Sequence, residues 1–349
     1  MSSAIISKRF NERKLKAVLL TIVVLSFLAA CQPQTDEIIL SGPIMGTDYR
    51  INIRVDQMDV SKAELENRIL DAMQAVNQSM STYIEFSELS AINRLPSGES
   101  VLLSDDLNSV LTESLYLSEL SNGAFDVTLG KAIRLWGFSE DGKITQRPSS
   151  ETILALKGSV GYRYLDLQNS KLTKLSDGLE INVSAIAKGY AVDKVAQVIE
   201  AQGIEHYLVN IGGELRAKGR NSEGKLWRIG VEKPHLLGGV AQVVLLDSMA
   251  IATSGDYRNF IVLDGQQFSH TIDSQTLKPV YHKLASVSVL ASRASTADGL
   301  ATALMAMGEI AGLEFANKHQ IAAYFIIRGD QDEHYTVQMT EQFRLNLPE

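Results

Sequence analysis

The chain has 349 residues, of which 45% are hydrophobic and 21% charged, and its formal net charge at pH 7 is −8. This composition is that of a globular protein with one large domain or two closely packed lobes. The acidic balance, without a cluster of Lys and Arg, argues against a nucleic-acid-binding protein. The single cysteine excludes internal disulfides and cysteine-rich zinc sites.

Residues 1–30 have the pattern of a secretory leader. Five basic residues precede an apolar run over residues 17–28, which is shorter than the roughly 20 apolar residues that span a bilayer. Small residues then stand directly before Cys31, as in a bacterial lipoprotein that is cut before a cysteine and lipidated on it. We therefore expect removal of the leader, a lipid anchor on Cys31, a tether over residues 31–40 and a domain over residues 41–349.

The first half of the chain after the leader is predicted to be rich in helices. Alternating apolar residues predict a strand over residues 49–55. The N-cap residues Ser61 and Ser104, each followed by periodic apolar residues, predict two helices. A third helical segment is expected over about 127–135, followed by a polar loop over 137–149.

From residue 164 onward, short strands dominate the pattern. They are predicted over residues 164–168, 171–175, 179–183, 206–211, 214–219, 226–232, 239–247, 249–253, 259–263, 285–290, 321–327 and 335–339. Helices are predicted over about 186–202, 294–307 and 309–318. This mixture indicates an α+β fold with a mainly antiparallel sheet, inserted helices and a helix-rich N-terminal lobe that ends near residue 160.

Three segments before residue 130 carry more glycine and polar residues than packing requires. In "GPIMGT", Met45 offers a soft surface for a flat ring, although a plain loop fits as well. In "STY", Tyr83 could stack on an aromatic ligand or be an ordinary surface residue. In "GAFDVT", Asp126 directly precedes a helix, where it could be an N-cap or mark a helix start that receives an anion.

The segment "INVSAIAKGYAVD" predicts a strand that runs into a helix, with Lys188 near the helix start. A lysine there is disfavoured by the helix dipole, which indicates that it meets a phosphate. Removal of the leader would leave a net charge of about −12, so a polyanionic ligand needs such a local cation. The glycine spacing of a P-loop is absent. The "NIGGE" segment after residue 208 reads as a structural hairpin turn.

Two further segments contain candidate catalytic or metal-binding side chains. His270 lies in "FSHTID", a segment dense with Ser, Thr and Asp, where it could be a general base or a solvated turn residue. In "STADGLATALMAMG", Asp298 and Thr302 are four residues apart and so share one face of a helix. Their oxygens could hold Mg²⁺, or Asp298 could cap the helix while Thr302 packs against alanines.

These pieces stand in the order and spacing of one family. From about Gly42 to about Ile327, the chain resembles the FAD:protein FMN transferases of the ApbE family. The matching pieces are "GPIMGT", "STY" with "SELSAIN", "GAFDVT", "IAKGYAVD", "LVNIGGE", "ATSGDYRNF", "HTID" and "STADGLATALMAMG". The resemblance implies an ApbE-like fold, FAD as substrate, Mg²⁺ as metal, and transfer of the FMN half to a Thr or Ser hydroxyl of another protein with release of AMP.

The resemblance also implies roles for individual residues. The family's FAD-contacting positions fall on Met45, Tyr83, Ala124, Phe125, Asp126, Asn182, Lys188 and Ile272. Its metal ligands fall on the Ala185 backbone carbonyl and the side chains of Asp298 and Thr302. The chain departs from the family at Asn182, where an Asp is common, and in "HTIDSQTLKP", which lacks the usual Pro and Gly.

The implied acceptors are flavin-bearing subunits of the sodium-translocating NADH:quinone reductase or of related electron-transport complexes. Such acceptors favour the periplasmic side of the inner membrane for the lipid-anchored protein. Gln32 lacks the Asp that often retains lipoproteins there, so sorting to the outer membrane stays open.

The expected chemistry is attack of a hydroxyl on a pyrophosphate, with Mg²⁺ and Lys188 offsetting charge and His270 as the base. Two alternatives stay open: an FAD pyrophosphatase that yields FMN and AMP, and a periplasmic flavin-binding lipoprotein without catalysis.

Overall fold

The computed structural model describes residues 36–55, 60–139, 141–234, 238–257, 259–329 and 334–348. The expected leader, the lipidated Cys31 and residues 31–35 of the tether lie outside the described residues. From Glu37 onward, the chain forms one compact unit.

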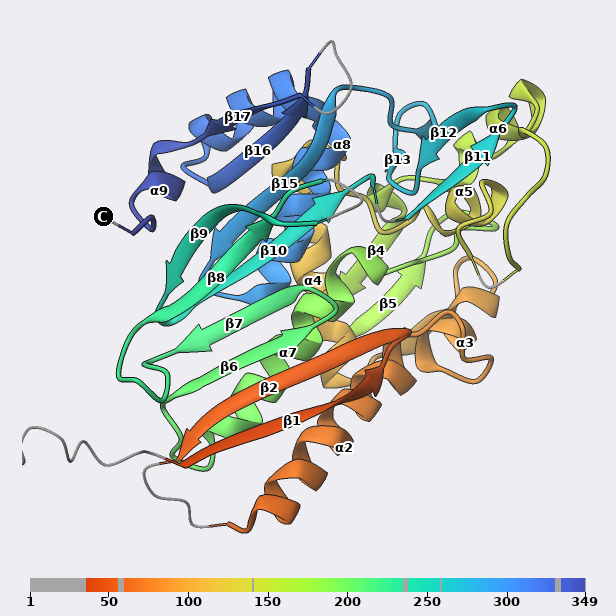
Figure 1. The fold of residues 1–349 in the computed structure, drawn as a ribbon. Helices are drawn as coiled ribbons and strands as arrows, with labels where there is room; N and C mark the ends of the chain where they lie inside the picture. Colours follow the sequence, from red (N-terminus) through yellow and green to blue (C-terminus); the bar gives the residue numbers. More distant parts are fainter. Residues whose placement is uncertain are drawn as a thin grey trace, which may run out of the picture. The chain divides into compact units, whose positions relative to one another are not determined.

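Eight strands form the main sheet of this unit. In spatial order they are β1 (Asp36–Ile44), β2 (Thr47–Val55), β6 (Tyr207–Ile211), β7 (Glu214–Lys218), β10 (Met249–Gly255), β15 (Leu284–Ala291), β16 (Ala322–Arg328) and β17 (Tyr335–Met339) (Figure 1). The pairings from β2 to β17 are antiparallel, which confirms the predicted α+β fold. Because β2 pairs with β6, the helix-rich N-terminal part is an insertion within one sheet. β1 was not predicted, and it begins inside the range expected for the tether.

The helices follow the apolar periodicity of the sequence. They are α2 (Lys62–Met80), α3 (Glu88–Arg94), α4 (Asp105–Leu120), α5 (Gly130–Leu135), α6 (Ser150–Ala155), α7 (Ser184–Glu200), α8 (Ala294–Lys318) and α9 (Glu341–Arg344), with 3₁₀ turns η1 (Lys157–Ser159) and η2 (Tyr162–Tyr164). Ser61 and Ser104 cap α2 and α4 as predicted, since each side-chain oxygen accepts a backbone N–H three residues later.

The main sheet is covered on both faces, because successive side chains of a strand point to opposite sides. On one face, Ala252, Val289 and Phe325 belong to the large core that α7 and α8 complete (Figure 1). On the other face, Ile251 and Leu290 belong to a second core. The strands that carry the second core are thus buried on both sides, which gives α7 and α8 a rigid platform.

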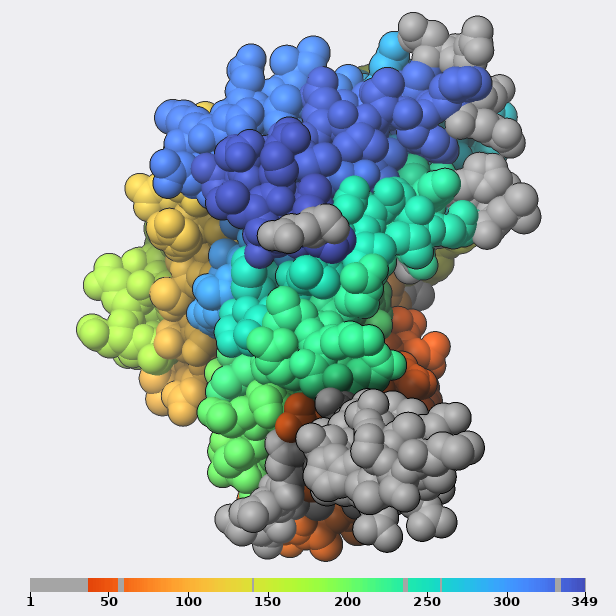
Figure 2. Space-filling view, turned by 60° about the vertical axis from the view of Figure 1, so that its left-hand side comes forward, coloured from red at the N-terminus to blue at the C-terminus, as the bar shows by residue number. Residues whose placement is uncertain are grey.

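Smaller elements complete the fold. They are the three-stranded sheet of β3 (Ser100–Leu102), β5 (Lys171–Lys174) and β4 (Leu165–Gln168), and the pairs β8 (Trp227–Glu232) with β9 (Val240–Leu246), β11 (Phe260–Leu263) with β12 (Gln266–Ser269), and β13 (Ile272–Asp273) with β14 (Lys278–Pro279). The β8–β9 hairpin and α9 close the second core. In Figure 2 the dark blue C-terminal residues lie against this green hairpin, where the Leu245 N–H donates to the Asn346 carbonyl at 3.0 Å.

Two local predictions were corrected by the structure. Residues 179–183 do not form a strand apart from one bridge between Glu180 and Leu129. The reason is that the Asn93 side chain binds both the N–H and the carbonyl of Ile181, each at 2.8 Å, so these groups are satisfied without a strand partner. The third helical segment is also shorter than predicted, because α5 begins only at Gly130.

The break between the two helices predicted at residues 294–318 is confirmed. α8 runs through this range, but Gly308 has a φ of 79° and interrupts the helical backbone. The ring of His282 fills the space beside Gly308, and its Nε2 lies 2.7 Å from the Met305 carbonyl oxygen. α8 is long and apolar enough to cross a membrane by composition, but it packs on β10 and β15 as a core helix.

Candidate active site

Three charged side chains meet where α7, α8 and β7 come together. The Nζ atom of Lys188 lies 3.0 Å from Oε1 of Glu214 and 3.8 Å from Oδ2 of Asp298. Both acidic residues are only 4% exposed, whereas 32% of the Lys188 side chain is accessible. This group, which we call the Lys188 cluster, contains two carboxyl groups and one ammonium group. When both carboxyl groups are ionised, one of their charges has no protein counterion within the cluster, which favours binding of a further cation or hydrogen-bond donor.

Burial and neighbouring charges shift the pKa values of Asp298 and Lys188 in the Lys188 cluster. Burial raises the pKa of Asp298, and the charge of Glu214 adds to that rise, while Lys188 and the Gly189 N–H oppose it. Burial lowers the pKa of Lys188, but attraction to the two carboxylates outweighs burial, so the net shift is upward. Lys188 therefore remains an ammonium ion at neutral pH and presents a positive charge to a ligand.

The backbone of α7 brings the Ala185 carbonyl close to Asp298. The Gly189 N–H donates to Oδ2 of Asp298 at 3.1 Å. In an α-helix the same N–H points at the carbonyl four residues earlier, which belongs to Ala185. Oδ2 of Asp298 and the Ala185 carbonyl oxygen thus both lie near the Gly189 N–H. Only glycine allows this approach, because a Cβ at position 189 would lie 2.3 Å from the Ala294 carbonyl oxygen.

Thr302 lies one turn beyond Asp298 on α8, and its Oγ1 is 3.4 Å from Oγ of Ser254 on β10. Mg²⁺ prefers hard oxygen atoms as ligands. Such oxygens are present on the Ala185 carbonyl, the Asp298 carboxylate and the Thr302 hydroxyl. Among the described residues, no group of three or more His, Cys, Asp or Glu side chains is placed to hold a metal ion. A cation at this position would therefore be held by carbonyl, carboxylate and hydroxyl oxygens together.

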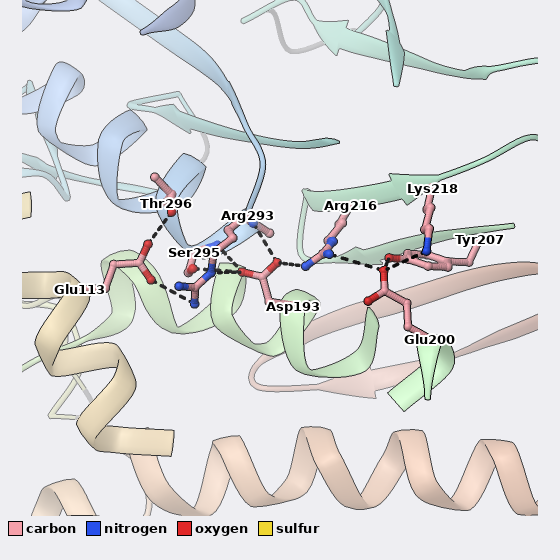
Figure 3. A network of polar contacts seen from close by, with 10 residues as sticks. Glu113, Asp193, Glu200, Tyr207, Arg216, Lys218, Arg293, Ser295 and Thr296 are labelled. Carbon is pink, nitrogen blue, oxygen red and sulfur yellow. Dashed lines mark hydrogen bonds and ion pairs between the residues drawn. The ribbon is translucent and has the colours of Figure 1, made fainter. Parts of the chain in front are cut away.

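A second buried network fixes the start of α8 (Figure 3). Asp193, on α7, accepts hydrogen bonds from the N–H groups of Ala294 and Ser295 and from the Ser295 hydroxyl, each at 3.0 Å. It also accepts one from Arg216 at 2.9 Å. Arg293, at the N-cap position of α8, makes no side-chain capping bond. Asp193 thus caps α8 from the neighbouring helix, and the capping alternative for Asp298, the fifth residue of α8, is wrong.

His270 lies in the turn between β12 and β13. Its Nδ1 is 3.1 Å from the Asn259 carbonyl oxygen, and a carbonyl can only accept, so Nδ1 carries the proton and Nε2 is left as the basic nitrogen. The Phe138 ring packs edge-on at 6.4 Å between centroids. Burial lowers the pKa of His270, and the positive charge of Lys188 also lowers it, which keeps the ring neutral at pH 7.

The sequence-predicted flavin residues fall into two groups. Met45 and Gly46 form the two-residue turn between β1 and β2, with φ values of 49° and 73°, so the "GPIMGT" segment is a hairpin and not a plain loop. Thr47, the next residue, lies beside Gly212 of the β6–β7 turn, close to Glu214. Tyr83 is 69% exposed after the end of α2. Tyr83 is thus open to solvent, whereas the Met45 side chain is half-buried and packs against the large core.

The remaining predicted flavin residues use their side chains within the protein. Phe125 and Ile272 are buried in the core. The Asp126 carboxylate accepts from the N–H and hydroxyl of Thr128 and from the Tyr162 N–H, and it does not cap the following helix, α5. Asn182 accepts from the Ser184 N–H at 2.9 Å. Ala124 is half-buried. These residues can reach a ligand mainly through their backbone.

An open groove of about 680 Å³ lies elsewhere, between α4 and η2. Tyr116, Tyr162 and Arg163 are among its lining residues, and the Arg163 guanidinium lies 4.9 Å from the Tyr162 ring centre. None of the sequence-predicted site residues lines this groove.

Sequence reasoning missed Glu214 and Asp193. The "NIGGE" hairpin exists as predicted, but its role is not only structural, because it delivers Glu214 to Lys188. A signal was present: Glu214 and Arg216 alternate on one face of β7, opposite Lys188 and Asp193 on α7. Only the pairing of the two elements turns this pattern into contacts.

The fold and the Lys188 cluster together mark a candidate enzyme site. The sequence model of the ApbE family matches residues 45–325. The FAD:protein FMN transferase of Vibrio cholerae is 40% identical over 314 residues, which are 89% of this chain and 94% of the relative. That of Escherichia coli K12 is 35% identical over 316 residues, 89% of each chain. The chain belongs to the ApbE family.

Solved structures agree with this assignment. The apo form of the Pseudomonas stutzeri flavinyl transferase ApbE superposes with a TM-score of 0.84 at 35% identity, over 91% of this chain and 98% of that one. The flavin transferase ApbE of Vibrio cholerae superposes with a TM-score of 0.83 at 38% identity, over 90% of this chain and 100% of that one. The predicted ApbE-like fold is thereby confirmed.

Proposed function

We propose that this chain is a Mg²⁺-dependent FAD:protein FMN transferase. It attaches FMN through a phosphoester bond to a Thr or Ser of a flavoprotein subunit and releases AMP. The names of its relatives support the flavin transfer. The observation that carries the proposal is the Lys188 cluster, which combines an accessible cation with a buried excess negative charge.

The chain's residues divide the reaction between them. Lys188 attracts the pyrophosphate of FAD. His270 takes the proton of the acceptor hydroxyl on Nε2, because Nδ1 is engaged with the Asn259 carbonyl. The hydroxyl oxygen forms a bond to the phosphorus on the FMN side, and the bridging P–O bond breaks, so that AMP leaves with the bridging oxygen. Met45 and Tyr83 supply apolar contact to the flavin nucleotide.

Ala185, Asp298 and Thr302 would hold Mg²⁺ in this proposal. The metal would offset negative charge on the phosphate oxygens during transfer. The buried negative charge of the Lys188 cluster supports a cation here, and Asp298, as a metal ligand, would not serve as the base.

The test is co-expression with the flavin-bearing subunit of a sodium-translocating NADH:quinone reductase or of a related electron-transport complex. We expect mass spectrometry to find one added FMN on a Thr or Ser of that subunit. Asp298→Ala is the matched control, which should leave the subunit unmodified. Unmodified subunit, together with AMP release from FAD and Mg²⁺ without acceptor, would instead identify a pyrophosphatase. Tight FAD binding without any turnover would identify a flavin-binding protein.

We propose that Cys31 anchors the mature protein to the periplasmic side of the inner membrane. The support is the order of basic residues, apolar run and small residues before the cysteine. Labelling with a radioactive fatty acid should mark the wild-type protein but not Cys31→Ser. Recovery of the labelled protein in outer-membrane fractions would contradict the inner-membrane part of the proposal.

A further inference from the structure

Glu214 uses only one of its two carboxylate oxygens. Oε1 contacts Lys188 at 3.0 Å, whereas Oε2 is buried and has no hydrogen-bond partner. The side chain is 5% exposed. A buried charged oxygen without a partner costs stability, so native proteins seldom keep one unless a ligand satisfies it.

Oε2 of Glu214 lies beside two turns, the β6–β7 turn and the β1–β2 turn. A Cβ built on Gly212, in the β6–β7 turn, would lie 3.3 Å from Oε2 and 2.9 Å from Cγ2 of Thr47. Thr47 directly follows the Met45–Gly46 turn of the β1–β2 hairpin. The unpartnered oxygen is thus next to the hairpin that carries Met45, whereas Oε1 is the atom that contacts Lys188.

We propose that Oε2 of Glu214 accepts a hydrogen bond from bound FAD, from a hydroxyl or an N–H of the flavin nucleotide. This inference rests on the proposed function, because it takes FAD as the ligand of the site. The carboxylate then has two roles: Oε1 holds Lys188 toward the pyrophosphate, and Oε2 binds a donor group of the same molecule. A hydrogen bond to a charged acceptor is worth more than a neutral one, so Glu214 contributes to affinity.

A Mg²⁺ ion is a less suitable partner for Oε2. The oxygens that fit Mg²⁺ lie on α7 and α8, at Ala185 and Asp298, which share the Gly189 N–H. Oε2 instead lies beside the turns of β1–β2 and β6–β7. Nucleotide hydroxyl and N–H groups are donors, as this acceptor requires.

The test is to titrate the full-length protein and the Glu214→Gln variant with FAD. Flavin fluorescence reports binding, and each titration is done with and without Mg²⁺. Glutamine keeps an oxygen for Lys188 but places an NH₂ group, which cannot accept, where Oε2 was. We expect the Kd for FAD to rise at least tenfold, with or without Mg²⁺. The matched control is Glu200→Gln, which removes another partly buried acid that contacts Arg216, and it should bind FAD like the wild type.

Thermal unfolding without ligand separates this role from a structural one. Because Glu214→Gln keeps an oxygen for Lys188 and leaves Asp298 as its counterion, we expect its Tm to stay close to that of the wild type. An unchanged Kd would overturn the proposal, as would a variant that is unfolded or has a lower Tm. Loss of affinity only when Mg²⁺ is present would make Glu214 a metal ligand and also overturn it. If wild-type protein binds FAD but transfers nothing, the proposed function fails while this inference stands.

Discussion

α7 carries two buried ionic groups that differ in how completely they are satisfied. Toward its C-terminal half, Asp193 accepts four hydrogen bonds, and Arg216 balances its charge. Toward its N-terminal half, the Lys188 cluster keeps an excess negative charge and an unpartnered oxygen on Glu214. A satisfied buried carboxylate stabilises the fold, whereas an unsatisfied one marks the place where a ligand completes the structure.

The two groups also depend on one another. The Asp193 network holds the first turn of α8 (Figure 3). Asp298 lies within the next turn of the same helix. The Asp193 network therefore helps to position Asp298, a carboxylate of the Lys188 cluster, and mutations should separate the two effects.

The largest expected effect follows loss of a carboxylate from the Lys188 cluster. Asp298→Ala should lower the rate of FMN transfer on the order of a thousandfold at limiting Mg²⁺, because the metal loses its only charged ligand. A Mg²⁺ titration of the initial rate measures this. Activity equal to wild type at limiting Mg²⁺ would refute the metal assignment.

The second largest effect is expected from removing His270, the proposed general base. His270→Ala should lower transfer at least about a hundredfold, the usual contribution of a general base, while the Kd for FAD stays within a few-fold. Single-turnover rates and FAD titration measure the two quantities. Weakened FAD binding with an unchanged single-turnover rate would make His270 a structural residue.

The pH profile gives an independent check on His270. Its pKa lies below the usual value of 6.5, because burial and the Lys188 charge disfavour the imidazolium. The neutral base is then the main form at pH 7, and kcat/KM should fall as the pH drops below 6.5. In His270→Ala this acidic limb should disappear. A limb centred above pH 7 in the wild type would contradict the assignment.

A smaller effect is expected from changing Asp193, whose hydrogen bonds and charge are satisfied within the protein. Asp193→Asn keeps the shape but removes the charge beside Arg216 and two acceptor sites, so it should lower the unfolding free energy by about 3 kcal/mol. Because the start of α8 is released, the Mg²⁺ concentration at half-maximal rate should also rise. Glu200→Gln, farther along the same network, should cost less than about 1 kcal/mol and leave Mg²⁺ dependence unchanged. Equal effects of both variants would argue against a positioning role for Asp193.

The smallest effect concerns Met45, which has a φ of 49° in the β1–β2 turn. Asparagine tolerates this conformation better, but Met45 also packs against the large core, so Met45→Asn should change the unfolding free energy by less than about 1 kcal/mol. It should also weaken FAD binding, because the apolar contact is lost. Denaturant unfolding and FAD titration measure both changes. A variant that is more stable and binds FAD as well as wild type would remove Met45 from the site.

The sequence by itself determined the class of fold and most elements. Ser61 and Ser104 predicted helix starts because N-capping is local, and the sequence predicted separate helices over residues 294–307 and 309–318, which Gly308 divides in the structure. It also singled out Lys188, Asp298 and Thr302 as candidate site residues, because polar side chains on otherwise apolar helices are visible within one segment.

Only the tertiary structure decided which carboxylates belong together. Glu214 and Asp193 lie in segments whose local patterns read as a hairpin turn and a helix, and their roles come from partners on other elements. Asp298 looked like a possible cap until Asp193 was found in that position. A hydrogen bond between elements far apart in the chain leaves no periodic signal, because it depends on how those elements pack, not on the spacing within either.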